Sequence, residues 1–386
     1  MILDRSYFNK GVSQIITMIF SMLRVILFYK VYSLDLVGRL LFVTSVVNIL
    51  APLVTLSASG YFIRETVLGN RKSIETHIRA FVAYSYIVTI ILAIAMFILM
   101  KSVIVVATVI SMIVFFVVSN LMITTNVKER FEVYVFMSLV AHPVSVILTL
   151  ILPSPFFVYT YMFISQIIVA LYYDKDIIYY LLHPLFSKQM IGDFLNNIKH
   201  FSISSISSVI LNNVDMLILG RMFTYTDISR YKLGVYIPSA IDSLTSTLSS
   251  VLFVRKGEDN YGKFLLMGLA LSSVVFAILI PRQILSIVFN GIVDDFVVSV
   301  SRVFGVVSII RIVNMYVTIR LIYNRRENIV SISNIVAMIL DLILNVILGL
   351  TIGIIGIPIA TLISEFCKVI FNTYKLITIE KVKSLS

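Results

Sequence analysis

Long apolar runs recur along the whole chain and alternate with short polar stretches. An α-helix needs about 20 apolar residues to cross the hydrocarbon core of a bilayer, and most of these runs have about that length. The pattern therefore predicts about twelve membrane-spanning helices, at 11–32, 36–59, 79–100, 102–123, 133–153, 155–173, 201–222, 232–253, 264–280, 297–319, 329–350 and 352–374. The first run is too long for the core of a signal peptide, so we expect it to be a retained span.

Composition supports an all-α integral membrane protein. The 386 residues are 59% hydrophobic and only 13% charged, and the mean hydropathy is +1.01. A soluble domain carries about 25% charged residues, so this chain lacks the polar surface to cover a globule in water. Its single cysteine, Cys367, excludes an intramolecular disulfide framework and any multi-cysteine metal site.

The net charge of +11 follows the predicted topology. With a cytoplasmic N-terminus, 21 of the 31 Lys and Arg residues fall in loops or ends on the cytoplasmic side and 7 on the opposite side. The positive-inside rule then places both termini in the cytoplasm of a multi-pass cell-membrane protein. Because the charge is topological, no nucleic-acid partner is expected.

The chain divides into two predicted lobes of six spans each. They cover 1–173 and 201–386, and 174–200 forms an amphipathic linker that we expect to lie along the cytoplasmic interface. At a constant offset of 191 residues, basic residues at span ends coincide between the lobes. The coinciding pairs are Lys30 with Arg221, Arg39 with Arg230, and Arg64 with Arg255. An even number of spans per lobe makes this a parallel repeat, with a central cavity between the lobes.

Polar residues inside spans 1 and 7 also coincide at this offset. Each set follows steps of four, four and three residues, so each lies on one helical face. The sets are Ser13, Thr17, Ser21 and Arg24 in span 1, and Ser204, Ser208, Asn212 and Asp215 in span 7. Arg24 and Asp215 could pair across the lobes, either as a fastening ion pair or as a latch that opens during transport.

Further intramembrane polar residues indicate a wet interior. Span 8 carries Asp242, span 10 carries Arg311, Asn314 and Thr318 at helical spacing, and span 11 carries Asn334, Asp341 and Asn345 on one face. Span 12 carries Thr361, Glu365, Lys368 and Asn372, and we expect Glu365 and Lys368 to form a local salt bridge. His142, beside Pro143, is expected to be a structural group. The stretch GLTIGIIGIP, which joins spans 11 and 12, predicts a tight turn.

Signatures of catalysis are sparse. The sequence contains no Cys/His metal constellation, no phosphate-binding loop and no Ser-His-Asp arrangement that a loop could present. Asp294 and Asp295 are adjacent carboxylates in an external loop, where a solvated acidic loop is the simpler interpretation. We therefore do not expect an enzyme.

Three stretches resemble the polysaccharide (O-antigen type) flippases of the multidrug/oligosaccharidyl-lipid/polysaccharide exporter superfamily. LNNVDMLILGRM is similar to the span-7 signature of that family, and LDLVGRLLFVTSVVNILAPLVTLSASGYFIRE to its span 2 and Gly-x-x-x-Arg exit. IGIIGIPIATLISEF resembles the motif that opens span 12, with Ile357 and Pro358 where alanines are usual. The resemblance implies two six-helix lobes that alternate access to a cavity, and a lipid-linked oligosaccharide on a phosphate or diphosphate carrier as cargo.

Such a cargo needs a cation for phosphate and hydroxyl or amide groups for sugar. We expect Arg24 and Arg311 to bind phosphate, because a guanidinium stays charged in a partly dry cavity. The sugar-binding candidates are Thr17, Ser21, Asn212 and Asn314. Asp215, Asp242 and Asp341 are candidates for ion coupling or gating, through Na⁺ or H⁺, and no other cofactor is expected.

Alternatives remain open. A cation or drug antiporter of the same superfamily would suit the carboxylates of the C-terminal half. A lipid II flippase is close in chemistry, but such proteins usually carry extra C-terminal spans. A membrane-embedded glycan polymerase or glycosyltransferase would have to use Asp294 and Asp295. The expected partners are membrane lipids and, for a flippase, the polymerase or glycosyltransferases of the same pathway; the chain is expected to act as a monomer.

Overall fold

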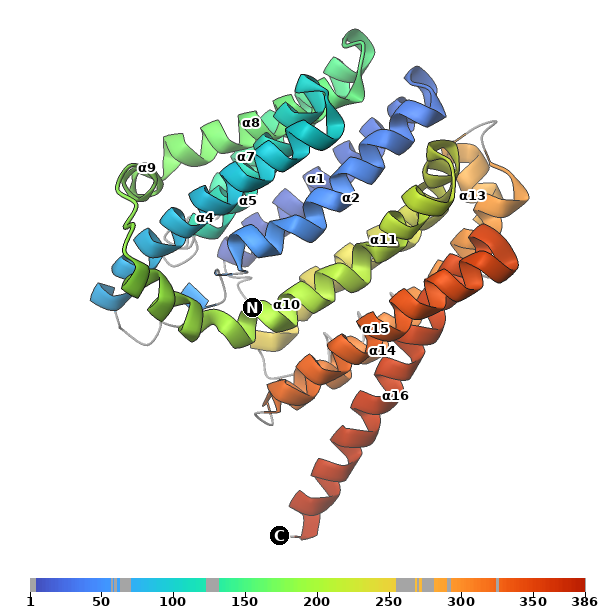
Figure 1. Ribbon diagram of the computed structural model, residues 1–386. Coiled ribbons are helices and arrows are strands. Elements are labelled where there is room, and N and C mark those ends of the chain that lie inside the picture. The colour runs from blue at the N-terminus through green and yellow to red at the C-terminus, as the bar shows by residue number, and fades with distance from the viewer. Residues whose placement is uncertain are drawn as a thin grey trace. The chain divides into compact units, whose positions relative to one another are not determined.

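A computed structural model describes residues 5–56, 58, 61–62, 71–122, 132–254, 268, 271–272, 281–289, 293–323 and 326–385. Within these ranges the regular structure is helical and no strand occurs. The chain divides into two compact units, Met1–Val209 and Ile210–Ser386, and each is described by itself (Figure 1).

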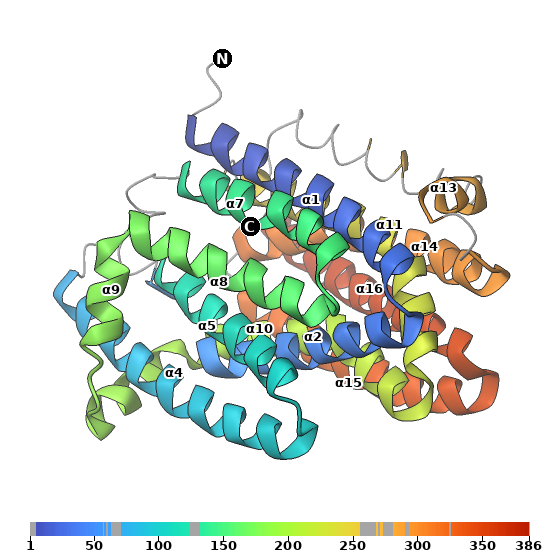
Figure 2. The same cartoon turned by 90° about the horizontal axis from the view of Figure 1, so that it is seen from above.

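Unit 1 is a bundle of long helices. Its elements are α1 (Arg5–Val31), α2 (Leu34–Thr55), α4 (Arg71–Met100), α5 (Val103–Leu121), α7 (Glu132–Ile151), α8 (Pro155–Tyr173) and the short α9 (Lys175–Leu182). Helix α7 packs against α1 and α8, and α5 packs against α2, α4 and α8. Figure 2 shows α1 and α7 running side by side.

Unit 2 is built around α14. Its elements are α11 (Tyr225–Val254), α13 (Pro281–Val288), α14 (Asp295–Tyr323), α15 (Glu327–Ile352) and α16 (Gly356–Leu385), and α10 (Lys188–Met222) crosses from unit 1 into unit 2. Helix α14 packs against α11, α15 and α16, and α15 packs along α16.

Every predicted span except 264–280 overlaps a helix of the structure, and most of 264–280 lies outside the described residues. In the described part of the chain, 7 helical stretches are long and apolar enough to cross a membrane, and one of them, Asn328–Lys381, comprises α15 and α16 together. Helices α1, α10 and α11 are not among the 7, and these are helices that carry many of the polar side chains discussed below. The structure is therefore that of a multi-pass membrane protein, while the count of twelve spans stays a prediction.

Three helix contacts of unit 1 recur in unit 2. The contacts α7 with α8, α5 with α8 and α2 with α5 have counterparts in α15 with α16, α14 with α16 and α11 with α14. In the predicted repeat, each helix of these unit 1 contacts corresponds to the helix six spans later in unit 2. A duplicated six-helix plan would give these three contacts, and the repeat of six spans stays a prediction.

The predicted linker 174–200 contains two helical pieces. It comprises α9 and the first turns of α10, which continues without a break through the predicted boundary at residue 200. The segment is tied to α4: Tyr86 donates to the carbonyl of Leu181 at 2.7 Å, and Arg79 donates to that of His183 at 2.8 Å. The division into compact units falls after Val209, inside α10.

The predicted tight turn between the last two spans is present. The 3₁₀ turn Gly353–Ile355 joins α15 to α16, and Gly353 has a φ of 73°, which favours glycine. A Cβ on Gly356 would lie 2.3 Å from the carbonyl oxygen of Leu348. The backbone conformation of the turn therefore favours glycine at 353, and the close approach of the start of α16 to α15 requires glycine at 356.

Candidate functional site

A polar seam joins α1 to α7 inside unit 1. The Ser138 hydroxyl of α7 lies 2.8 Å from the Ser13 hydroxyl and 3.0 Å from the Thr17 hydroxyl of α1. Ser13 also donates to the carbonyl of Tyr134 at 3.0 Å. The face of α1 that residue spacing predicts is therefore the face that packs on α7.

Arg24 lies at the end of this seam and is 4% exposed. One terminal nitrogen donates to the Ser145 hydroxyl at 3.1 Å and to the Met162 sulfur at 2.8 Å, and it lies 3.4 Å from His142 Nδ1. The guanidinium carbon is 5.1 Å from the centre of the Tyr159 ring, within cation–π distance. Helices α7 and α8 thus surround the cation with neutral groups.

No carboxylate of the described part of unit 1 forms an ion pair with Arg24. The other terminal nitrogen donates only to Ser21, at 3.4 Å, and Nε has no hydrogen-bond partner in the structure. A buried charge without a counterion is costly, and a buried donor without an acceptor adds to that cost. The site therefore has the chemistry to accept an anionic group.

His142 contacts Arg24 and Gln166 rather than standing alone beside Pro143. Because this arginine nitrogen carries hydrogens and no acceptor, we assign the unprotonated ring nitrogen to Nδ1, which faces it, and the ring proton to Nε2. Nε2 lies 3.3 Å from the Gln166 side-chain nitrogen, whereas Gln166 Oε1 is buried and has no partner. Exchanging the amide oxygen and nitrogen of Gln166 lets His142 Nε2–H donate to Oε1, so we assign the amide in that orientation.

Arg311 lies in different surroundings in unit 2. Its guanidinium binds Asp242 of α11 at 2.8 Å and Glu365 of α16 at 2.9 Å. It also donates to the Asn212 side chain of α10 at 3.3 Å. Glu365 forms the expected local ion pair with Lys368, at 2.6 Å, so this carboxylate joins two cations.

Two further carboxylates of unit 2 are buried. Asp341 of α15 is fully buried and accepts from Asn345 and Ser364, each at 3.0 Å. Asp215 of α10 accepts from Tyr231 at 2.5 Å and from Thr361 at 3.4 Å.

Oxygen atoms around these carboxylates remain available. Asp215 Oδ1 and Asn345 Oδ1 are buried and have no hydrogen-bond partner in the structure. Asp215 and Asp341 act on each other electrostatically, and Lys232 of α11 acts on Asp215. We call four carboxylates of unit 2 and the three cations near them the carboxylate network. Its members are Asp215, Asp242, Asp341, Glu365, Lys232, Arg311 and Lys368.

One face of α16 organises the network. Thr361, Ser364, Glu365, Lys368 and Asn372 recur at helical spacing. Asn372 donates to Asn314 of α14 at 2.8 Å, so this predicted sugar-binding residue is engaged within unit 2. The sequence pattern identified four of these five positions, and it identified polar residues on α14 and α15, but it could not show which of them are in contact.

The predicted site residues therefore fall into two groups. Thr17, Ser21 and Arg24 lie along the seam of unit 1, whereas Asn212, Asp215, Asp242, Arg311, Asn314 and Asp341 belong to or border the carboxylate network of unit 2. An ion pair between Arg24 and Asp215 would join the two units, and it stays a prediction. Sequence reasoning did not identify Ser138, Ser145, Met162, Gln166, Tyr231 or Ser364; only serine spacing on α7 could have pointed to the first two.

The acidic pair considered for catalysis has structural partners. Asp294 accepts from the backbone N–H of Val297 at 2.9 Å, as a helix N-cap does, and lies 3.6 Å from Arg230. Asp295 pairs with Arg282. Across the described residues, no group of three His, Cys, Asp or Glu side chains is placed to hold a metal ion.

The chain shares its fold with solved structures of transporters of the MOP superfamily. It is similar to the outward-facing structure of a multidrug resistance MATE family transporter of that superfamily, with a TM-score of 0.64 and 15% identity over 99% of this chain and 96% of that one.

Two other similar structures extend the comparison. The lipid II flippase MurJ, in an inward closed conformation, has a TM-score of 0.69 and 14% identity over 96% of this chain and 87% of that one. A MOP superfamily transporter from Pyrococcus furiosus, described as having a binding pocket of reverse polarity, has a TM-score of 0.67 and 13% identity over 97% of this chain and 94% of that one. No protein-family model and no curated protein matches the sequence. Identities this low establish the fold, not the cargo.

Proposed function

We propose that this protein is a flippase that moves a lipid-linked oligosaccharide across the cell membrane by alternating access. The observation that carries the proposal is Arg24, a buried cation that no described carboxylate of its unit neutralises. A phosphate or diphosphate group would supply the missing charge and the missing acceptors. The three resembling sequence stretches and the fold shared with MurJ support the same cargo class.

The seam of unit 1 is suited to hold a glycolipid headgroup. Arg24 would bind the phosphate, and the hydroxyl groups of Thr17 and Ser21 would hydrogen-bond nearby sugar. Met162 and Tyr159 would give the guanidinium a partly dry setting, in which an ionic hydrogen bond is stronger than in water.

Arg311 is better suited to organise unit 2 than to bind phosphate. Asp242 and Glu365 already neutralise it, so an incoming phosphate would have to displace a carboxylate. We propose that Arg311 positions Asn212 along the sugar path, that Asn372 positions Asn314, and that Arg311 joins α11, α14 and α16 during the transport cycle.

Asp215 and Asp341 are the proposed coupling groups. The two carboxylates, the Asn345 amide oxygen and the Thr361 hydroxyl form an oxygen-rich cluster in which Asp215 Oδ1 and Asn345 Oδ1 lack partners. Such oxygens fit Na⁺ or a proton. Uptake of either cation would reduce the repulsion between the carboxylates and so link an ion gradient to the conformation of unit 2.

A cation or drug antiporter is the second candidate. In the carboxylate network four carboxylates face three cations, and the similar structures include MATE multidrug transporters. This acidic excess would suit a cationic substrate. A glycan polymerase or glycosyltransferase has less support, because Asp294 and Asp295 are engaged by a helix cap and by arginines.

Depletion of the protein in cells, followed by extraction of lipid-linked glycans, tests the flippase proposal. We expect complete lipid-linked units to accumulate on the cytoplasmic side, and the Arg24→Ala protein to clear them about 10- to 100-fold more slowly, as loss of a charge-assisted contact implies. Arg24→Lys should retain partial activity. Arg39→Ala, which removes an exposed arginine paired with Asp35, should act like the parent protein.

Each alternative predicts a different result. A glycan that lacks a sugar or stays unpolymerised, with no accumulated units, would point to an enzyme. Efflux of cationic dyes without any change in lipid-linked glycans would point to the antiporter. The proposed setting is the cytoplasmic membrane with both termini in the cytoplasm, a monomeric chain, and the pathway's polymerase or glycosyltransferases as partners.

A further inference from the structure

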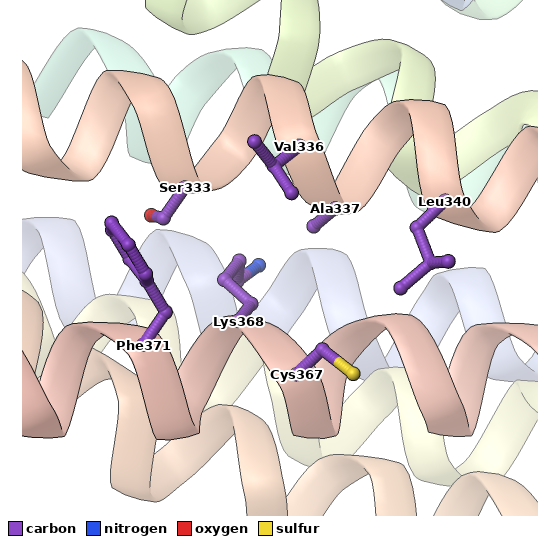
Figure 3. Close-up of a pocket in the computed structure, with 7 residues that line it drawn as sticks. All are labelled: Ser333, Val336, Ala337, Leu340, Cys367, Lys368 and Phe371. Carbon is purple, nitrogen blue, oxygen red and sulfur yellow. The ribbon is translucent and has the colours of Figure 1, made fainter.

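A small pocket lies between α15 and α16 in unit 2. Its volume is about 210 Å³, and its lining residues are Ser333, Val336, Ala337, Leu340, Cys367, Lys368 and Phe371. Figure 3 shows Cys367, Lys368 and Phe371 on α16 facing the α15 side chains across this space. The pocket is smaller than the roughly 300–1,000 Å³ of drug-sized ligand sites, so it suits a segment of an apolar chain.

The pocket opens on an apolar surface. Val336 is 57% exposed, Phe371 is 37% exposed, and their exposed neighbours on α15 and α16 include Ile339 and Ile370. Both helices belong to a stretch long and apolar enough to cross a membrane. Lipid chains are therefore the molecules that reach the mouth of the pocket.

The ammonium group of Lys375 lies beside the pocket, toward the C-terminal end of α16. Lys375 follows Lys368 by seven residues, or two turns, so it lies on the same side of the helix about 10 Å further along. Its ammonium is 5.7 Å from the centre of the Phe371 ring, which lines the pocket. Among the described residues no carboxylate forms an ion pair with Lys375.

We propose that this pocket binds one acyl chain of an anionic phospholipid whose phosphate pairs with Lys375. The chain would lie between α15 and α16 and pack against Phe371 and the methylene stem of Lys368. The positive charge favours an anionic lipid, and the small apolar volume favours a chain over a sugar headgroup. The proposal does not depend on the cargo of the protein.

The bound lipid chain would be linked to Arg311 through two successive ion pairs. Lys368 lines the pocket and pairs with Glu365, which in turn pairs with Arg311. A lipid chain that restrains Lys368 would therefore change the ion pairs of the carboxylate network. The lipid composition of the membrane would in this way influence the conformation of unit 2.

The single cysteine of the chain provides the measurement. Cys367 is exposed and lines the pocket, so alkylation of the purified full-length protein by N-ethylmaleimide reports on access to the site. In micelles that contain phosphatidylglycerol, we expect alkylation about fivefold slower than in micelles that contain phosphatidylcholine, which is the order expected for one lysine–phosphate contact.

Variants separate the pocket from ordinary lipid contact. Val336→Phe fills the mouth of the pocket and should abolish the difference between the two lipids. Val346→Phe makes the same change at an exposed position of α15 outside the pocket and should preserve it. Lys375→Gln should abolish the difference.

Three results would overturn the proposal. They are equal alkylation in the two lipids for the parent protein, identical behaviour of the Val336→Phe and Val346→Phe proteins, and protection by a prenyl phosphate but not by phosphatidylglycerol. If Val336→Phe does not fold, the Lys375→Gln result decides alone.

Discussion

Two arginines inside predicted membrane spans have opposite surroundings. Arg311 binds Asp242 and Glu365, so removal of any one of the three side chains takes an ion-pair partner from the others. Arg24 is surrounded by Ser145, Met162 and other neutral groups. The first arrangement joins three helices, and the second leaves a buried cation without a counterion among the described residues of its unit.

Glu365 is expected to be the most sensitive ionic residue for stability. Glu365→Gln leaves Arg311 with one carboxylate and Lys368 with none, and breaking a buried ion pair costs about 3–5 kcal/mol. The thermal midpoint of the purified protein should therefore fall by several degrees.

Glu380→Gln is the matched control for this change. Glu380 pairs with Arg320, and both side chains are more than a third exposed. Its loss should cost about 0–1 kcal/mol, as exposed pairs do. Equal shifts for the two variants would contradict the assignment of Glu365 as a buried hub.

Asp215 is expected to report the coupling ion. If Na⁺ binds at the cluster of Asp215, Asp341 and Asn345, NaCl should raise the thermal midpoint of the parent protein above that in choline chloride. At a concentration 100 times the dissociation constant the stabilisation is about 2.7 kcal/mol. Asp215→Asn should abolish this shift, and Asp193→Asn, at an exposed position of α10, should not. A parent protein that does not respond to Na⁺ would rule out sodium and leave the proton.

At the scale of elements, α16 and α14 hold unit 2 together. The polar face of α16 reaches α10, α14 and α15 through Thr361, Glu365 and Ser364 respectively. Helix α14 packs on α11 as closely as backbones allow at Gly234, where a Cβ would lie 2.8 Å from both the Val297 carbonyl oxygen and Val300 Cβ.

Gly234→Ala should therefore separate α11 from α14. The added methyl group overpacks a tight contact, which typically costs about 1–3 kcal/mol. Gly192→Ala is the control, because a Cβ there meets nothing within 4 Å. Thermal unfolding of both variants checks the prediction. We expect the thermal midpoint to fall only for Gly234→Ala, and unchanged midpoints for both variants would show that α11 and α14 can move apart without loss of stability.

At the scale of the whole molecule, the predicted repeat and the distribution of basic residues lead us to expect one topology. The contacts of α5 with α2 and α8 have counterparts in those of α14 with α11 and α16. A parallel repeat of six spans returns the chain to the side on which it began, so both termini should share the cytoplasm.

Cysteine labelling tests this topology. In a Cys367→Ser background, Gln283→Cys on α13 should react with an impermeant maleimide in intact cells. Asn196→Cys on α10 and Ser386→Cys at the C-terminus should react only after permeabilisation. Both native positions, Gln283 and Asn196, are exposed in the structure. The reverse pattern would invert the topology.

The sequence by itself determined that this is an all-helical, multi-pass membrane protein, where most of the described helices lie, and the polar face of span 1. These properties are local: they depend on runs of apolar residues and on spacing along one helix, which hydropathy and helical periodicity report directly. The expected salt bridge of Glu365 with Lys368 was predictable for the same reason, and the structure confirms it.

Only the tertiary structure decided which charges meet. Arg311 binds Asp242 and Glu365, which lie 69 and 54 residues away along the chain, whereas Arg24 lies among neutral groups more than 100 residues away. Spacing within a helix says which residues share a face but not which helix that face meets. The difference between a neutralised arginine and one that lacks a counterion among the described residues of its unit therefore arises from helix packing.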